Sequence, residues 1–358
     1  MAHARRKAST LVVAAGLVAA LGACGTSHDS GGSASGKTLA VTMWGGSAQK
    51  AHVDSYVTPF AAENGVTVRQ DSPTDYAKLT AQVQAKKVSW GITEIEPNFA
   101  NNACADGRLT KLPDDVKAAA TAAGVDPGFM GDCAIPNLQY SFTIAYNTKK
   151  FATSHPTTWA EFFDTKRFPG KRGFWKYATG GIFEAALLAD GVPAEKLYPL
   201  DIDRAFKKLN TIKKDIVFYD TGDEQAQLVA SGEAPLVQAW NGRIYDAAKA
   251  GQPVANEWNQ NLISYDQVGI PAGYPNTALA QKWMTWFLGN PKAQAADADA
   301  SAYAPVSPKA MEFVKPEVAK ELTTFPANKA KSAGVIDYGY WAKNYDKVTE
   351  RLNAWIAS

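Results

Sequence analysis

Strand-like and helix-like segments alternate along most of this chain, and that order restricts it to a small set of folds. Short apolar runs are each followed by a segment whose apolar residues recur at helical spacing. Repeated units of this kind predict an α/β protein with mostly parallel sheets flanked by helices. The predicted strands are residues 37–44, 66–70, 91–95, 173–176, 216–218, 236–240 and 264–271, and the predicted helices are residues 47–63, 75–86, 98–106, 159–164, 181–190, 201–212, 221–231, 277–288, 292–301 and 337 onward.

The N-terminus has the features of an export signal. Basic residues 5–7 precede an apolar run over residues 11–21, which is shorter than the roughly 20 residues that a membrane-spanning helix needs. Small residues then lead to Cys24 in a pattern that resembles a bacterial lipobox. We predict that residues 1–23 are a signal peptide and that Cys24 is lipidated. A plain secretory signal with an incidental cysteine is the alternative, and the export route stays open.

A flexible tether is predicted over residues 24–36, because this Gly- and Ser-rich run has no apolar surface to bury. The body is then expected outside the cytoplasm, held on the outer face of a membrane by the lipid on Cys24. The formal net charge is +2 over 358 residues, and it becomes −1 without basic residues 5–7. A body so close to neutral argues against binding nucleic acid, which requires a basic surface.

Two cysteines and two histidines belong to the body of the chain. In an oxidising compartment, Cys104 and Cys133 favour a disulfide, and two buried free thiols are the alternative. We interpret His52 and His155 as packing or surface residues. With so little histidine, we predict no metal site.

No catalytic motif is present in the sequence. The glycines around Ser47 lack the second glycine of a nucleophile elbow, and the phosphate-binding, dinucleotide-binding and zinc-protease motifs do not occur. We therefore predict a protein that is not an enzyme and needs no cofactor. A Ser/His/Asp site that forms only in three dimensions remains an alternative, so a cell-surface hydrolase is the rival function class.

Aromatic and acidic residues gather where the predicted strands end. Trp44 ends the first strand, Glu96 follows the third, and Trp240 ends a later one. Tyr265 and Asp266 lie in the segment that crosses between the two blocks. Ligands of open α/β sheets bind outside the carboxyl ends of strands, and aromatic faces with a few carboxylates suit a cationic organic ligand. The alternative for any single tryptophan is a place in the core.

Five stretches of the body carry a resemblance to a known family. They are residues 88–97 (VSWGITEIEP), 184–192 (EAALLADGV), 197–206 (LYPLDIDRAF), 239–243 (AWNGR) and 268–271 (VGIP). They resemble the spermidine/putrescine-binding proteins of ABC importers, and the resemblance extends from about Leu39 to Trp355.

This resemblance implies the two-lobed, type II fold of periplasmic binding proteins. In that fold each lobe is a mostly parallel sheet flanked by helices, crossing strands join the lobes, and the solute binds between them. We predict that residues 37–146 with about 268–315 form lobe one. Residues 147–267 with about 316–358 would form lobe two.

The resemblance also implies which residues contact the solute. It assigns that role to Trp44, Glu96, Trp240 and Asp266, with Tyr265 in the place of a neighbouring tryptophan. One departure concerns the stretch after the first strand of the second lobe. Polyamine binders of this family carry two acids there, whereas residues 177–181 contain none.

That departure bears on the charge of the ligand. Gly180 and Gly181 open a predicted helix whose free N–H groups favour an anion, and Arg243 adds a positive charge nearby. A ligand with one amine and one carboxylate suits this arrangement, and so does a single quaternary amine.

We predict a monomeric solute-binding lipoprotein that captures a polyamine or related small amine and delivers it to the permease subunits of an ABC importer. A zwitterionic, amino acid-like solute or a quaternary amine is the first alternative. Ferric-ion binding through Tyr338 and Tyr340, and tethered adhesion, are further alternatives.

Overall fold

The structure, a computed structural model, describes residues 38–358. The predicted signal peptide, Cys24 and the tether lie outside the described residues. The strands of the described part are β1 (Thr38–Thr42), β2 (Thr67–Asp71), β3 (Ile92–Ile95), β4 (Ala134–Asn147), β5 (Arg172–Trp175), β6 (Ile216–Tyr219), β7 (Leu236–Trp240), β8 (Val254–Gly269) and β9 (Gly334–Val335).

Helices follow most of these strands. The α-helices are α1 (Gly46–His52), α2 (Thr58–Asn64), α3 (Tyr76–Gln84), α4 (Pro97–Ala105), α5 (Asp114–Ala123), α6 (Trp159–Phe163), α7 (Ile182–Ala189), α8 (Ile202–Asn210), α9 (Gly222–Ser231), α10 (Asn241–Lys249), α11 (Thr277–Leu288), α12 (Pro291–Ser301), α13 (Pro316–Ala319), α14 (Pro326–Lys329) and α15 (Tyr338–Ala357). A π-helical turn, η2 (Val53–Val57), connects α1 to α2, and short 3₁₀ turns include η4 (Ala178–Gly180) and η7 (Pro308–Glu312).

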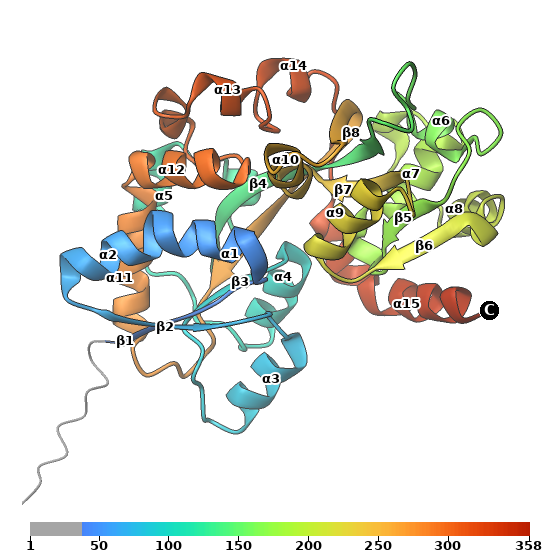
Figure 1. The fold of residues 1–358 in the computed structure, drawn as a ribbon. Coiled ribbons are helices and arrows are strands. Elements are labelled where there is room, and N and C mark those ends of the chain that lie inside the picture. Colours follow the sequence, from blue (N-terminus) through green and yellow to red (C-terminus); the bar gives the residue numbers. More distant parts are fainter. Residues whose placement is uncertain (1–37) are drawn as a thin grey trace, which may run out of the picture. The chain divides into compact units, whose positions relative to one another are not determined.

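The strands form one sheet in the order β2-β1-β3-β8-β4-β7-β5-β6, with β9 beside β8 (Figure 1). Strands β1, β2 and β3 pair in parallel, and so do β5, β6 and β7. We call the part packed around β1–β3 the first lobe and the part packed around β5–β7 the second lobe. This is the predicted two-lobed α/β fold.

Two long antiparallel strands join the lobes. Strand β8 pairs with β3 near Gly269 and with β4 along most of its length, and β4 pairs with β7 over Phe142–Tyr146. The sequence predicted only the end of β8, as residues 264–271, and missed β4, β9, α5, α10 and the short helices α13 and α14. Because β4 and β8 are shared, each lobe contributes residues to the same short stretch of sheet.

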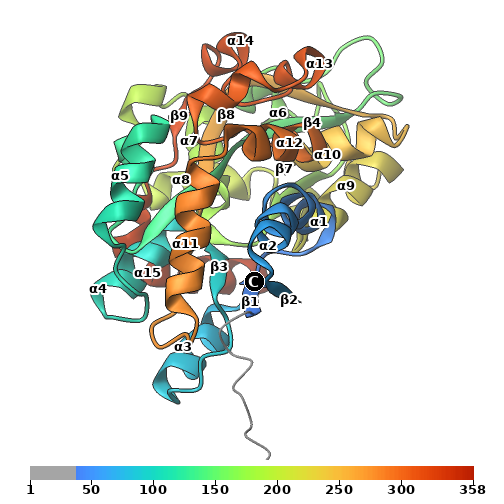
Figure 2. The same cartoon turned by 90° about the vertical axis from the view of Figure 1, so that its left-hand side faces the viewer.

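Each lobe has its own apolar core. In the first, Leu39 and Val41 of β1 are fully buried with Phe60 of α2 and Trp283 of α11. Helix α11 lies against α5, as Figure 2 shows. In the second lobe the core includes fully buried aromatic residues such as Trp159, Phe174, Phe183 and Trp341.

Several helix starts follow from the residues that precede them. Thr158 and Asp337 accept hydrogen bonds from the first turns of α6 and α15, and Thr221 forms a capping box with Glu224 at α9. Ser47, the first residue of the predicted helix 47–63, does not cap it. Helix α1 begins at Gly46, and the Ser47 hydroxyl donates to Oδ2 of Asp246 over 2.9 Å.

The predicted disulfide is present between Cys104 at the end of α4 and Cys133, just before β4. It closes a 29-residue separation that contains α5. Within residues 38–358, the helices are all too short or too polar to cross a membrane.

Candidate ligand-binding site

A cavity of about 670 Å³ opens where the strands of both lobes end. Trp44 follows β1, Glu96 follows β3 and Trp240 ends β7, and all three side chains line it. Asp266 of β8 and Arg243 of α10 line it as well. The structure therefore brings five of the eight predicted ligand-binding residues to one cavity, at the edge where an open α/β sheet binds ligands.

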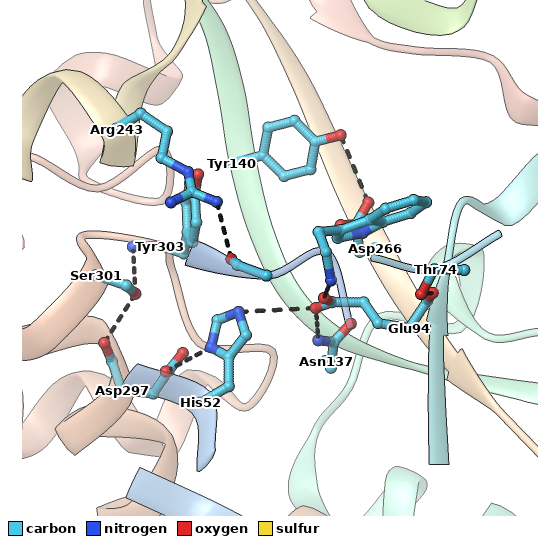
Figure 3. A network of polar contacts seen from close by, with 12 residues as sticks. His52, Thr74, Glu94, Asn137, Tyr140, Arg243, Asp266, Asp297, Ser301 and Tyr303 are labelled. Carbon is cyan, nitrogen blue, oxygen red and sulfur yellow. Dashed lines mark hydrogen bonds and ion pairs between the residues drawn. The ribbon is translucent and has the colours of Figure 1, made fainter. Parts of the chain in front are cut away.

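Asp266 and Glu94 both line the cavity, and with Glu96 they make up its acidic cluster (Figure 3 shows Asp266 and Glu94). Nε1 of Trp44 donates to Oδ2 of Asp266 over 2.8 Å, and the Tyr140 hydroxyl lies 3.5 Å from Oδ1. The amide of Asn137 donates to Oε1 of Glu94 over 2.6 Å. These donors hold both carboxylates in fixed orientations.

Glu96 is the third acid of the cluster, and groups from both lobes hold it. The hydroxyl of Thr179, in η4 of the second lobe, donates to Oε1 over 2.7 Å. The hydroxyl of Tyr76, in α3 of the first lobe, lies 3.3 Å from Oε2 and accepts from the Glu96 backbone N–H over 3.0 Å. Glu96 therefore sits at the junction between the lobes.

The cavity disfavours negative charge on its own acids. Burial raises the pKa of Glu96 to about 6, against hydrogen bonds from Thr179 and Tyr76 that lower it. Burial also raises the pKa of Asp266 well above its ordinary value, and the charges of Glu94 and Glu96 raise it further. A cation placed among these acids would relieve that repulsion, as is typical of a site built for a positively charged group.

Aromatic side chains form the walls around the acids. In the first lobe Trp44 packs edge to face on Tyr76, with ring centroids 6.1 Å apart. In the second lobe Trp240 packs edge to face on Trp175 at 5.1 Å, and Tyr177 also lines the cavity. Such faces attract a cationic group and cover its apolar part.

Arg243 brings positive charge into the same cavity. Its Nη1 donates to the Ser47 hydroxyl over 2.9 Å and its Nη2 to the Gly45 carbonyl over 3.3 Å, so it reaches from the second lobe to the first. A Cβ on Gly222 would lie 2.5 Å from its Nε, and one on Gly46 would lie 3.0 Å from its Nη1. Glycine at these two positions leaves the space that the guanidinium occupies.

The other three predicted residues do not line the cavity. Tyr265 precedes Asp266 on β8, and because neighbouring residues of a strand face opposite sides, it points away and stacks on Phe129 at 4.3 Å. Gly180 and Gly181 are covered by other side chains. A Cβ on Gly180 would lie 2.8 Å from the Trp175 ring, and one on Gly181 would lie 3.0 Å from the Gln238 amide.

The sequence reasoning missed several residues of the cavity. Glu94 carried a usable signal, since it lies two residues before Glu96 and so on the same face of the strand. Tyr140 was missed with β4, and Tyr76 belongs to a predicted helix whose exposed face was not identified. His52, interpreted as a packing or surface residue, is buried and lines the cavity.

Comparison with known proteins agrees with this architecture. The chain is 33% identical to the gamma-aminobutyric acid-binding protein of Pseudomonas aeruginosa over 330 residues, which cover 90% of this chain and 92% of that protein. It is 23% identical to the spermidine/putrescine-binding periplasmic protein of Escherichia coli over 326 residues, or 84% of this chain and 89% of that protein.

The fold is also that of solved binding proteins. The structure of the Atu4243-GABA receptor is 40% identical, with a TM-score of 0.81 over 89% of this chain and 98% of that one. Residues 55–327 match the family described as bacterial extracellular solute-binding protein. The chain therefore belongs to the bacterial extracellular solute-binding proteins, the components of ABC importers that bind the solute.

Proposed function

We propose that this protein captures a small amino acid whose amine lies far from its carboxylate, with gamma-aminobutyrate as the first candidate. The observation that carries the proposal is that Arg243 lines the same cavity as Glu94, Glu96 and Asp266. A guanidinium and a group of carboxylates in one cavity match the two ends of such a zwitterion. Binding and release need no chemical step, so the proposal includes no catalytic residue.

The ammonium end suits the acidic cluster. Asp266 and Glu96 are buried, and their raised pKa values indicate that a positive charge between them would stabilise their ionised forms. The Trp44 indole, which donates to Asp266, adds an aromatic face beside that position. A hydrogen bond to a charged group contributes about 1.5–3 kcal/mol, so the acids can supply much of the affinity.

The carboxylate end suits Arg243. Within the described residues its buried Nε has no hydrogen-bond partner, and its terminal nitrogens are held by one hydroxyl and one carbonyl. Oδ1 of Asp223 lies 3.7 Å from Nη1, but the Asp223 side chain is 78% exposed, so water screens that charge. A ligand carboxylate is the better partner because it would be desolvated with the guanidinium.

A polyamine is the second candidate, supported by the relatives that are about 23% identical. It would need acids for an amine at each end. The stretch 177–181 has none, and Ala178 is fully buried. The gamma-aminobutyric acid-binding relatives, at 33% and 40% identity, support the zwitterion instead.

Calorimetry with four ligands of similar length tests this proposal. We expect gamma-aminobutyrate to bind more tightly than butylamine, which lacks the carboxylate, than butyrate, which lacks the amine, and than putrescine. Arg243→Gln should weaken gamma-aminobutyrate by roughly tenfold or more, because one charged hydrogen bond is lost, and it should not weaken butylamine, which has no carboxylate to lose that bond.

Arg204→Gln is the matched control, since Arg204 pairs with Asp190 on the surface of the second lobe and does not line the cavity. It should change no affinity. Butylamine binding as tightly as gamma-aminobutyrate in the wild type would contradict the zwitterion proposal.

We also propose that Cys24 anchors the protein to the outer face of the membrane through a lipid. The support is the sequence pattern of a basic start, an apolar run, small residues and a cysteine before a Gly- and Ser-rich tether. Cys24→Ser should move the protein from the membrane fraction to the soluble one, or leave the signal uncleaved. Cleaved Cys24→Ser protein that stays with the membrane would overturn the anchor.

A further inference from the structure

His52 occupies an unusual place for a residue of a binding cavity. It ends α1, just before the π-helical turn η2, and its side chain is 1% exposed although it lines the cavity. Its Nδ1 lies 2.7 Å from Oδ1 of Asp297, and its Nε2 lies 3.7 Å from Oε1 of Glu94 (Figure 3). We propose that His52 is a built-in cation of the site, and that it makes the cavity select a ligand with one ammonium group over a diamine.

The positions of the two ring nitrogens carry this proposal. A neutral imidazole has one nitrogen that donates and one that presents a lone pair. Here both nitrogens face carboxylate oxygens, so in either neutral tautomer a lone pair would point at a negative charge. The doubly protonated ring avoids this, donating to Asp297 at hydrogen-bond distance and facing Glu94 as an ion pair.

The elements packed around His52 place both aromatic and charged groups beside its ring. Tyr56 of η2 stacks on the ring at 5.5 Å, and Tyr303 after α12 lies at 6.5 Å, so neither adds charge. Burial lowers the pKa of His52, but Asp297 of α12 and Glu94 of β3 raise it by more, against a smaller opposing effect of Arg243. The net direction is upward, in agreement with the geometry.

The consequence for the ligand follows from the charges of the cavity. His52 lies between Asp297 and Glu94, so part of the negative charge of the acidic cluster is already compensated by the protein. Glu96 and Asp266 are the acids of the cluster that His52 does not pair with, and they contact the aromatic residues Tyr76 and Trp44. One ammonium satisfies these, whereas the second charge of a diamine would meet the positive field of His52 and Arg243. This inference rests on the proposed zwitterionic ligand for its biological meaning.

His52→Gln tests the inference, with gamma-aminobutyrate and putrescine as probes. The change removes one positive charge, and a dication gains about twice as much from that removal as a monocation does. We expect putrescine to bind about tenfold more tightly, and the ratio of gamma-aminobutyrate to putrescine affinity to fall by about threefold, because a single ammonium gains about half as much free energy. His155→Gln is the matched control, because His155 stacks on Tyr146 and pairs with Glu257 without lining the cavity.

Nitrogen NMR of the ¹⁵N-histidine-labelled wild-type protein gives a second readout that needs no folded variant. Both nitrogens of His52 should carry a proton at pH 7 and remain protonated above the pH at which an ordinary histidine titrates. One unprotonated nitrogen at pH 7, or a His52→Gln ratio equal to that of His155→Gln, would overturn the proposal. The putrescine measurement tests His52 even if gamma-aminobutyrate proves not to be the ligand, so the two proposals can fail separately.

Discussion

Glu96 lowers the stability of the folded protein at neutral pH, although it belongs to the cavity proposed to bind the ligand. Its side chain is buried between Thr179 and Tyr76, and its pKa is raised to about 6. An acid whose pKa is raised on folding keeps its proton more readily in the folded state. It therefore destabilises the fold as pH rises from about 4.5 to about 6, and the loss remains at neutral pH.

Glu96→Gln should consequently raise the stability of the ligand-free protein at pH 7 by about 2 kcal/mol, with the gain vanishing below about pH 4.5. The same change should weaken binding of an ammonium ligand at pH 7, because it removes a carboxylate from the cavity. If an ammonium pairs with ionised Glu96, wild-type affinity should fall as pH drops through about 6, and this fall should be shallower in Glu96→Gln. Denaturant unfolding and calorimetry between pH 4.5 and 8 measure both effects.

Glu184 offers the control for this experiment. It is a buried acid of α7 whose pKa burial raises to about 7, and it accepts from Tyr198 over 2.6 Å and Trp341 over 3.0 Å within the second lobe. Glu184→Gln should alter the pH dependence of stability and leave that of binding unchanged. An equal change in binding would show that the Glu96 effect comes from stability alone.

The sequence pattern predicted which residues lie at the ends of strands better than it predicted which way their side chains point. Trp44, Glu96 and Trp240 could be placed because a strand pattern ends at or beside each of them, and the sheet edge collects such positions. Tyr265 and Asp266 could not be separated, since strand β8 was recognised only in part and its inward face was unknown.

At the scale of elements, the sequence predicted local units and missed the parts that depend on both lobes. Strand β4 is buried on both faces along most of its 14 residues, so it has no alternation of apolar and polar side chains. Strand β8 contains a mostly polar run, residues 256–261, near its start, and only Asn256 and Glu257 of that run pair with β4 before pairing resumes at Leu262. These strands become recognisable only when each has the other as a partner.

Two of the missed helices, α5 and α10, were missed for local reasons. Helix α5 is mostly alanine and charged residues, and it presents few apolar residues at helical spacing. Helix α10 begins with Asn241-Gly242, a pair that usually indicates a turn. Gly242 is needed there because a Cβ would lie 2.5 Å from the Ser301 carbonyl. The close contact between α10 and the end of α12 therefore explains why Gly242 lies inside a helix, which local helix propensity does not explain.

At the scale of the whole molecule, hydrogen bonds tie the two lobes across the cavity. Nη1 of Arg243 and the carboxylate of Asp246, both on α10, share the hydroxyl of Ser47 on α1. On another side, Thr179 of the second lobe donates to Glu96 of the first. A ligand that holds Arg243 and the acidic cluster at once would favour the arrangement in which these contacts form.

Closure of the lobes is the last prediction. Adding gamma-aminobutyrate should lower the radius of gyration measured by small-angle scattering.

Ser47→Ala tests the contacts that join the lobes. It removes the hydroxyl to which Arg243 and Asp246 of α10 both bond, and Ser47 itself does not line the cavity. It should weaken gamma-aminobutyrate by roughly three- to tenfold, because the contacts are partly exposed and worth less than a buried charged hydrogen bond. The order of preference among ligands should stay the same, since the charges of the cavity are untouched. Ser231→Ala is the control, because the Ser231 hydroxyl bonds only within one lobe, to the Leu228 carbonyl of α9. It should leave the affinity for gamma-aminobutyrate unchanged. Binding of gamma-aminobutyrate without any change in scattering would contradict closure of the lobes. A Ser47→Ala variant that binds as tightly as wild type would show that these contacts play no part in closure.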